Sequence, residues 1–268
     1  LSELPPKVIQ DYHCDMTPLQ MRLYESFSKA TLKDGVLKRL CSHPAMVVTP
    51  THSEYESISQ ELSEFGSSLR DVKQSPKLMA LEQLLGELGI GDEDVLVNKE
   101  TGSHRVLIFS QMKELLTLVE EDLFKARMPR VTYLRMDGSV EPTRRHSIVT
   151  RFNADPTIDC LLMTTHVGGL GLNLTAADVV IFLEHDWNPT KDLQAMDRAH
   201  RIGQKKTVNV YRLIMRHTLE EKIMNVQRFK THIANAVVNK DNSSLTSMNT
   251  AELLSLFKVE DEAEADTS

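Results

Sequence analysis

The stretch QAMDRAHRIGQ, residues 194–204, holds the side chains of this chain that are best suited to phosphate chemistry. Arg198 and Arg201 are permanently charged, and each guanidinium is a planar fork of donors that matches phosphate oxygens. If the stretch is helical, Gln194 and the two arginines stand at i, i+4 and i+7 and share one stripe. Two such forks could neutralise the charge on a transferring γ-phosphoryl group, with the glutamine bridging nucleotide and protein. The alternative is a merely soluble helix in which Asp197 pairs with Arg201.

The elements that would position this stretch are regular from residue 105 onward. Apolar, β-rich runs recur at 105–110, 131–136, 159–165, 179–184 and 208–214. Helix-like segments fall between them, at 111–126, 141–153, near 167–173 and at 188–202. Strands that alternate with helices and are apolar enough to be buried on both faces predict an α/β fold with a parallel sheet flanked by helices. Ligands of such sheets bind beyond the carboxyl ends of the strands, so we look for the site there.

The flanking segments predict helices of their own. Before the sheet we expect an extended stretch at 7–16, then a helix that begins with Thr17 as its cap and Pro18 in its first turn, and a second helix that ends before Pro44. We then expect a loop or partly ordered segment at 51–70, a helix at 75–88 and a polar connector at 89–104. After it we expect a long helix at 218–238, a polar bridge, a short helix at 251–257 and a disordered acidic tail at 258–268.

Composition excludes several classes of protein. The chain has 268 residues and a formal net charge of −7, so a nucleic-acid partner requires a local basic surface. Its three cysteines are far apart, without the spacing of a zinc site or a disulfide framework, which favours a reducing compartment. It has no apolar run long enough for a membrane span and no signal core, and it reads as a fragment of a longer chain.

Polar residues follow each predicted strand. Ser110 and Gln111 follow the first, Asp137 and Gly138 the second, TTHVGGLGLN (164–173) the third and HDWNP (185–189) the fourth. The glycines of the third segment could cradle phosphate, but without GK[ST] this is no P-loop, and a tight turn is the alternative. Asp137–Gly138 reads as a turn.

Local charge is more informative than the total. Residues 186–216 contain seven Lys/Arg against three Asp, a local net charge of +4 that could hold a nucleic-acid backbone. Lys205, Lys206, Arg212 and Arg216 lie in this segment just past the two arginines. Trp187, the only tryptophan, could stack on or wedge into a nucleic acid, or pack under its loop. The histidines at 43, 166 and 185 are read as structural, because no spacing joins them into a metal site.

Taken in order, four blocks resemble the second RecA-like lobe of superfamily-two helicases, specifically the Swi/Snf-type duplex-DNA translocases. They are RVLIFSQM, YLRMDGS, LLMTTHVGGLGLNLTAADVVIFLEHDWNP and QAMDRAHRIGQ, and LPPK and KRLCSHP ahead of them also look similar. Three further segments narrow the resemblance to the modifier-of-transcription family, which removes TATA-binding protein from promoter DNA. They are QDYHC, the run from RRHSIVTRFNADP onward and FKTHIANAVVNKDNSSLTSMNTAELLSLF. The resemblance covers most of 1–50 and 105–257.

The resemblance assigns roles residue by residue. Arg198 and Arg201 would be arginine fingers, with Gln194 on the γ-phosphate side, and Gly171 and Asn173 would approach nucleotide. Residues at the DNA backbone would be Ser110, Gln111, Thr164, Thr165, Gly168 and Trp187, with Lys205 from the basic segment. No Walker lysine loop and no DE-type metal motif is present. The resemblance therefore implies that ATP and Mg²⁺ are held mainly by a first lobe, and that upstream repeats grip TATA-binding protein.

The resulting expectation is half of a nuclear, ATP-driven DNA translocase. It divides the chain into a leading segment with a helical insertion (1–104), the RecA-like lobe (105–216), a C-terminal helical brace or latch (217–257) and the tail (258–268). Its partners would be duplex DNA, the first lobe and TATA-binding protein, with no membrane. The alternatives are a nucleosome-remodelling Swi/Snf-type lobe and a regulatory interaction module.

Overall fold

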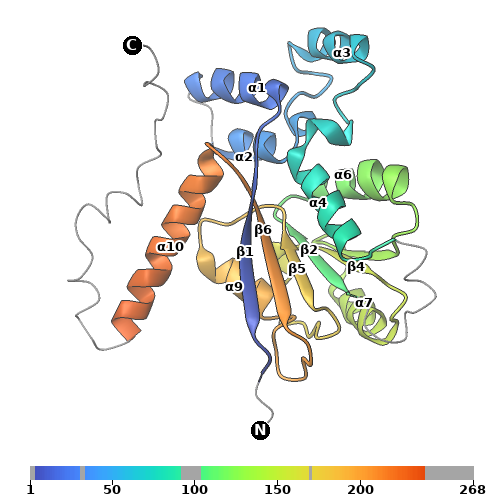
Figure 1. Cartoon of the computed structure of the whole chain (residues 1–268), viewed down its shortest axis with the longest axis vertical. Coiled ribbons are helices and arrows are strands. Elements are labelled where there is room, and N and C mark those ends of the chain that lie inside the picture. Colours follow the sequence, from blue (N-terminus) through green and yellow to red (C-terminus); the bar gives the residue numbers. More distant parts are fainter. Residues whose placement is uncertain (1–3, 31–33, 92–103, 169–170, 239–268) are drawn as a thin grey trace.

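The computed structural model describes residues 4–30, 34–91, 104–168 and 171–238 of the chain. A six-stranded sheet in the order β1-β6-β5-β2-β4-β3 forms its centre, and every pair of neighbouring strands is parallel (Figure 1). The strands are β1 (Lys7–Cys14), β2 (Val106–Ser110), β3 (Tyr133–Met136), β4 (Cys160–Thr164), β5 (Val179–Phe182) and β6 (Val208–Met215). The prediction of a parallel α/β sheet flanked by helices is confirmed.

The two faces of the sheet are buried by alternate residues of the same strands. In β2, Val106 and Ile108 belong to one core with α4 (Pro76–Glu87) and α6 (Lys113–Leu118), which a π-helical turn at Val119–Lys125 extends. Leu107 and Phe109 belong to a second core with α7 (Pro142–Ala154), α8 (Thr165–Gly168) and α9 (Pro189–Met196). Because side chains of a strand alternate between the faces, continuous apolar runs like VLIF are what a doubly covered strand requires.

β1 lies at one edge of the sheet and comes from the leading segment. Its residues pair in parallel with β6 from Lys7–Val208 to Cys14–Met215. The sequence predicted an extended stretch here but not its pairing. The edge strand of the sheet therefore comes from the first described residues, which pair with the last strand in the chain, β6.

Three further helices precede the lobe and surround a small core of their own. α1 (Pro18–Lys29) begins with the predicted Thr17–Pro18 start, where Thr17 and Gln20 form a capping box. α2 is Asp34–Ser42, and it ends before Pro44 as predicted. α3 (Tyr55–Glu64) lies where a loop or partly ordered segment was predicted, and that prediction was wrong. Its buried residues Ile58 and Leu62 are one helical turn apart and pack in the same core as α1, so tertiary packing overrides a polar sequence.

α10 (Leu219–Val238) runs along the side of the sheet beside β1 and β6, opposite α4 and α6 (Figure 1). It confirms the long helix predicted at 218–238. The short helix at 251–257, the acidic tail and most of the 89–104 connector lie outside the described residues. None of the helices described here combines the length and apolarity that a bilayer crossing requires.

His43 is a fully buried histidine between α2 and the turn at Pro44–Met46. Its Nδ1 accepts a hydrogen bond from the backbone N–H of Ala45 at 3.1 Å, so that nitrogen is unprotonated. Burial, helped by the charge of Arg70, lowers the pKa of His43 from 6.5 to about 4. The histidine is structural, as the sequence predicted.

Stability should therefore fall with pH through this residue. Between pH 6.5 and 4 the unfolded chain binds a proton at His43 that the folded chain does not, so stability present above 6.5 is lost as pH falls. The loss is about 3 kcal/mol in the free energy of unfolding. In His43→Asn, which keeps a cap acceptor, urea unfolding at pH 7 and pH 4 should show a correspondingly smaller loss. His146→Asn, at an exposed position, is the control. Equal losses in the wild type and His43→Asn would exclude the assignment.

Candidate functional site

A buried carboxylate, Glu184, organises the carboxyl ends of β2 and β5. The Oγ of Ser110 lies 2.5 Å from Glu184 Oε2, and the N–H groups of Gln111 and Met112 donate to that oxygen at 2.9 and 3.3 Å. Ser42 of α2 donates its hydroxyl to the other oxygen at 3.3 Å. Glu184 is fully buried, and a buried carboxylate is tolerated when donors surround it. Sequence reasoning missed this residue, although an acid that closes an apolar run, VVIFLE, was a visible signal.

Six of the predicted DNA-contacting residues gather at this carboxyl edge. Gln111 extends from β2 and donates Nε2–H to Asp186 at 3.2 Å. Thr165 donates its hydroxyl to the Ser110 carbonyl at 3.4 Å, which joins the ends of β4 and β2. Thr164 ends β4, Gly168 ends α8, and Trp187 is half-buried in the loop before α9. The structure thus brings Ser110, Gln111, Thr164, Thr165, Gly168 and Trp187 to one edge.

The helix predicted at 188–202 is shorter than expected. It begins as predicted, with Asn188 as N-cap and Pro189 in the first turn, but α9 ends at Met196. The prediction that Gln194, Arg198 and Arg201 share one helical stripe was wrong. The carbonyl of Arg198 accepts a hydrogen bond from the N–H of Leu174 at 3.0 Å, so it is not used within a continuing helix.

Gln204 holds this segment in its non-helical path. Its buried amide donates to the carbonyls of Thr175, Ala177 and Ala199 at 3.2, 2.8 and 3.1 Å. Its Oε1 accepts from the N–H groups of Lys205 and Lys206. One side chain therefore ties the end of QAMDRAHRIGQ to the segment that leads into β5. The final glutamine of the motif was the visible sequence signal for this non-helical path.

The two arginines lie beside the segment that enters β5, away from the carboxyl edge where the sequence predicted the site. Arg201 is exposed, and its guanidinium is 3.4 Å from the carbonyl of Gly171. Arg198 is half-buried. Gly171 has a φ of +76°, which a side chain would strain. Arg201 therefore lies beside the segment that carries Gly171 and Asn173, the two residues predicted to face nucleotide. The alternative pairing of Asp197 with Arg201 does not form, because Asp197 pairs with Lys7 at 2.9 Å.

Three other predicted site residues lie near the arginine segment and are exposed. Gln194 lies on α9, Asn173 precedes β5, and Lys205 follows the arginines. The Asn173 carbonyl accepts from the side chain of Asn153 at 2.8 Å. The predicted site residues therefore form two groups, one at the carboxyl edge and one at the arginine segment, instead of a single cluster.

Much of the basic charge predicted at 186–216 is neutralised by acids from elsewhere in the fold. Arg212 pairs with Asp11 of β1 at 2.5 Å, and Arg216 lies 3.3 Å from Asp15. Further pairs join Lys191 to Asp186 at 2.9 Å and Lys206 to Asp178 at 3.4 Å. Linear charge counting could not include these partners, because three of the four acids lie outside the segment.

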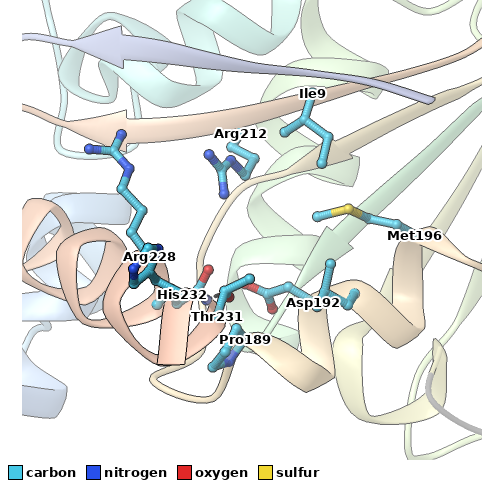
Figure 2. A pocket seen from close by; sticks show the side chains of 10 residues that line it. Ile9, Pro189, Asp192, Met196, Arg212, Arg228, Thr231 and His232 are labelled. Carbon is cyan, nitrogen blue, oxygen red and sulfur yellow. Dashed lines mark hydrogen bonds between the residues drawn. The ribbon is translucent and has the colours of Figure 1, made fainter. Parts of the chain in front are cut away.

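A groove with a volume of about 370 Å³ lies between α9, α10 and the β1–β6 edge. Figure 2 shows Arg228, Thr231 and His232 of α10 across from Pro189 and Asp192 of α9. Its charged groups bond to the protein itself: Arg212 and Arg228 both pair with Asp11, and Asp192 accepts from Gln227 at 2.8 Å. Neither Arg198 nor Arg201 lines it, so the groove is separate from the arginine segment.

Among the described residues, no three or more His, Cys, Asp or Glu side chains converge in a way that could hold a metal ion. His185 is buried, with Nε2 2.9 Å from the Leu213 carbonyl, which gives it a structural role. Asp137 stands at the predicted turn. Burial alone would raise its pKa, but hydrogen bonds from Ser139 and Arg135 outweigh burial and lower it to about 2.

The comparisons with known proteins agree with this architecture. Residues 77–203 match the helicase conserved C-terminal domain. The chain is 51% identical over 302 residues, 99% of its length, to TATA-binding protein-associated factor 172 of Homo sapiens. It is also 51% identical over 288 residues, 96% of its length, to TATA-binding protein-associated factor MOT1 of Saccharomyces cerevisiae. The chain belongs to the Swi/Snf-type helicases.

A solved helicase lobe supports the fold. The crystal structure of the C-terminal part of the Fun30 ATPase domain superposes with a TM-score of 0.63 at 25% identity, and the match covers 84% of this chain and 90% of that one. The RecA-like fold and the second-lobe resemblance are thereby confirmed. The chain spans 16% of the length of the human factor and 15% of the yeast one.

Gly168 has a packing reason to be glycine, whether or not it meets DNA. A Cβ at this position would lie 2.5 Å from Cε1 of Phe109, whose ring is fully buried in the core. We expect Gly168→Ala to lower the free energy of unfolding by about 1–3 kcal/mol, the usual range for overpacking.

Urea unfolding of a double-mutant cycle tests this contact. Phe109→Leu should recover part of the loss, so that the double variant costs less than the sum of the singles. Gly86→Ala is the control, because open space surrounds that exposed helical position. Strict additivity of Gly168→Ala and Phe109→Leu would show that the ring is not what excludes a methyl group.

Proposed function

We propose that this chain is the second lobe of an ATP-driven, duplex-DNA translocase that removes TATA-binding protein from promoter DNA. The observation that carries the proposal is the identity, over nearly the whole chain, to proteins named as TATA-binding protein-associated factors. The match to the helicase conserved C-terminal domain supports an ATP-driven translocase as the type of enzyme. A nuclear location follows from that role.

ATP is the substrate of the motor, and this lobe offers it guanidinium groups. Arg201 is exposed, and no carboxylate pairs with it in the part of the chain that the structure describes, so its fork of donors is available to an incoming phosphate. Arg198 lies three residues earlier, two residues past the end of α9. In the proposed complex both approach a γ-phosphate seated on the first lobe, which also holds Mg²⁺. Phosphoryl transfer depends largely on such electrostatic positioning.

Duplex DNA is proposed to lie across the carboxyl edge, where Ser110, Gln111 and the Trp187 loop meet. Closure of the two lobes around ATP and their reopening would move this edge along one strand. The predicted brace at 217–257 is retained in this proposal with α10 as its described part.

The arginines are tested in the full-length protein. Arg198→Ala and Arg201→Ala should each slow DNA-stimulated ATP turnover by about 10³–10⁵-fold, as expected for arginine fingers, while ATP affinity is largely retained. Arg144→Ala, an exposed arginine on α7, is the matched control and should turn over normally. Steady-state turnover and nucleotide-binding titrations provide the two readouts. Turnover within a few-fold of wild type would remove the finger assignment.

The chain by itself should not hydrolyse ATP, because the groups that would hold the triphosphate and Mg²⁺ are proposed to belong to the first lobe. Phosphate release by the purified chain should equal the background without protein. Turnover that Arg198→Ala abolishes in the isolated chain would contradict the two-lobe proposal.

A further inference from the structure

Three consecutive backbone carbonyls of the HDW loop, residues 185–187, each accept a hydrogen bond from a side chain outside the four helicase blocks. Lys38 of α2 donates to the His185 carbonyl at 2.8 Å. Gln227 of α10 donates to the carbonyl of Asp186 at 2.6 Å, and Lys230 donates to that of Trp187 at 3.1 Å. Two helices from opposite ends of the chain therefore hold the loop that carries the tryptophan.

Two of these donors are cations that differ from those of the predicted basic segment. Lys38 and Lys230 are not paired with a carboxylate within the described residues, and their bonds are to carbonyl and amide oxygens. An ammonium group has three donors. Lys38 uses two, on His185 and on the Oε1 of Gln111 at 2.7 Å, and exposed Lys230 uses one.

The acid of the loop forms its ion pair with a different lysine. Asp186 lies 2.9 Å from Lys191 and also accepts hydrogen bonds from Gln111 and from the N–H of Asn188. Its ion-pair partner is thus Lys191, while the nearby charge of Lys38 also helps to lower the pKa of Asp186. Among the described residues, Lys38 and Lys230 are in no ion pair and donate to the loop that begins α9 from two different helices.

We propose that Lys38 and Lys230 bind backbone phosphates of duplex DNA on either side of the Trp187 loop. This rests on the proposed function, which puts DNA at the carboxyl edge. A lysine acts on phosphate as a point charge with adjustable donors, so each can keep its carbonyl bond while facing a phosphate. Because the two residues belong to α2 and α10, the DNA surface of this lobe includes the flanking helices as well as the motif segments.

The test is the salt dependence of duplex binding by the full-length protein without nucleotide. Each phosphate contact contributes about 0.9 to the slope of log K against log salt concentration. Lys38→Gln and Lys230→Gln should each reduce the slope by about 0.9 and weaken binding about eightfold at 0.1 M monovalent salt. Lys38→Arg should retain the slope, and Lys222→Gln, an exposed lysine on α10, should leave it unchanged.

The outcomes separate this inference from the proposed function. Lys230 is exposed, so its glutamine variant remains folded, and wild-type slopes for it and for Lys38→Gln would overturn the inference. If Gln111→Ala and Trp187→Ala weaken duplex binding while both lysine variants bind normally, only the lysine assignment fails. If none of the four changes binding, the proposed DNA edge fails with it. Reduced slopes alongside normal turnover of Arg198→Ala would support the lysines and reject the arginine fingers.

Discussion

A buried ion pair, Lys77–Glu220, fixes the carboxyl edge of the sheet to the helices on both of its sides. Both side chains are inaccessible to solvent, with Nζ and Oε1 2.5 Å apart. Lys77 also donates to the Leu183 carbonyl at 2.6 Å, and Glu220 accepts from the N–H of Met215 at 2.9 Å. The pair thus joins α4, the ends of β5 and β6, and the first turn of α10. Loss of either partner would leave a buried charge uncompensated, so α4 and α10 are integral to the lobe.

The same edge and the arginine segment are linked by one short helix. α9 starts at Pro189, directly after the Trp187 loop, and ends at Met196, two residues before Arg198. Its eight residues span about 12 Å at the α-helical rise. In the proposed function, α9 would therefore connect the DNA edge to the segment that carries the guanidinium groups. Nucleotide and DNA would then meet the same lobe at two separate surfaces.

Local patterns predicted what depends on neighbours along the chain. The five apolar runs, the Thr17–Pro18 and Asn188–Pro189 helix starts and the long helix at 218–238 all have short-range causes, and the structure confirms them. The errors have long-range causes. α3 folds because Ile58 and Leu62 meet α1, and α9 stops because Leu174 and Gln204 take over hydrogen bonds that a longer helix would use. β1 joins the sheet by pairing with residues that lie 201 positions later in the sequence, from Lys7–Val208 to Cys14–Met215.

The distribution of charge also depends on residues that are far apart in the sequence. This distribution determines how a chain with a net negative charge could bind DNA. The segment 186–216 carries a local net charge of +4, yet Asp11, Asp15 and Asp178 reach it from other parts of the fold. Lys38 and Lys230 are 192 positions apart, and no window of sequence contains both. Folding alone puts them on either side of one loop, through α2 and through α10, the helix that the Lys77–Glu220 pair anchors. In the inferred arrangement, the affinity of this lobe for a phosphate backbone would depend on the packing of α2 and α10, so a perturbation of either helix would alter DNA binding without changing the four helicase blocks.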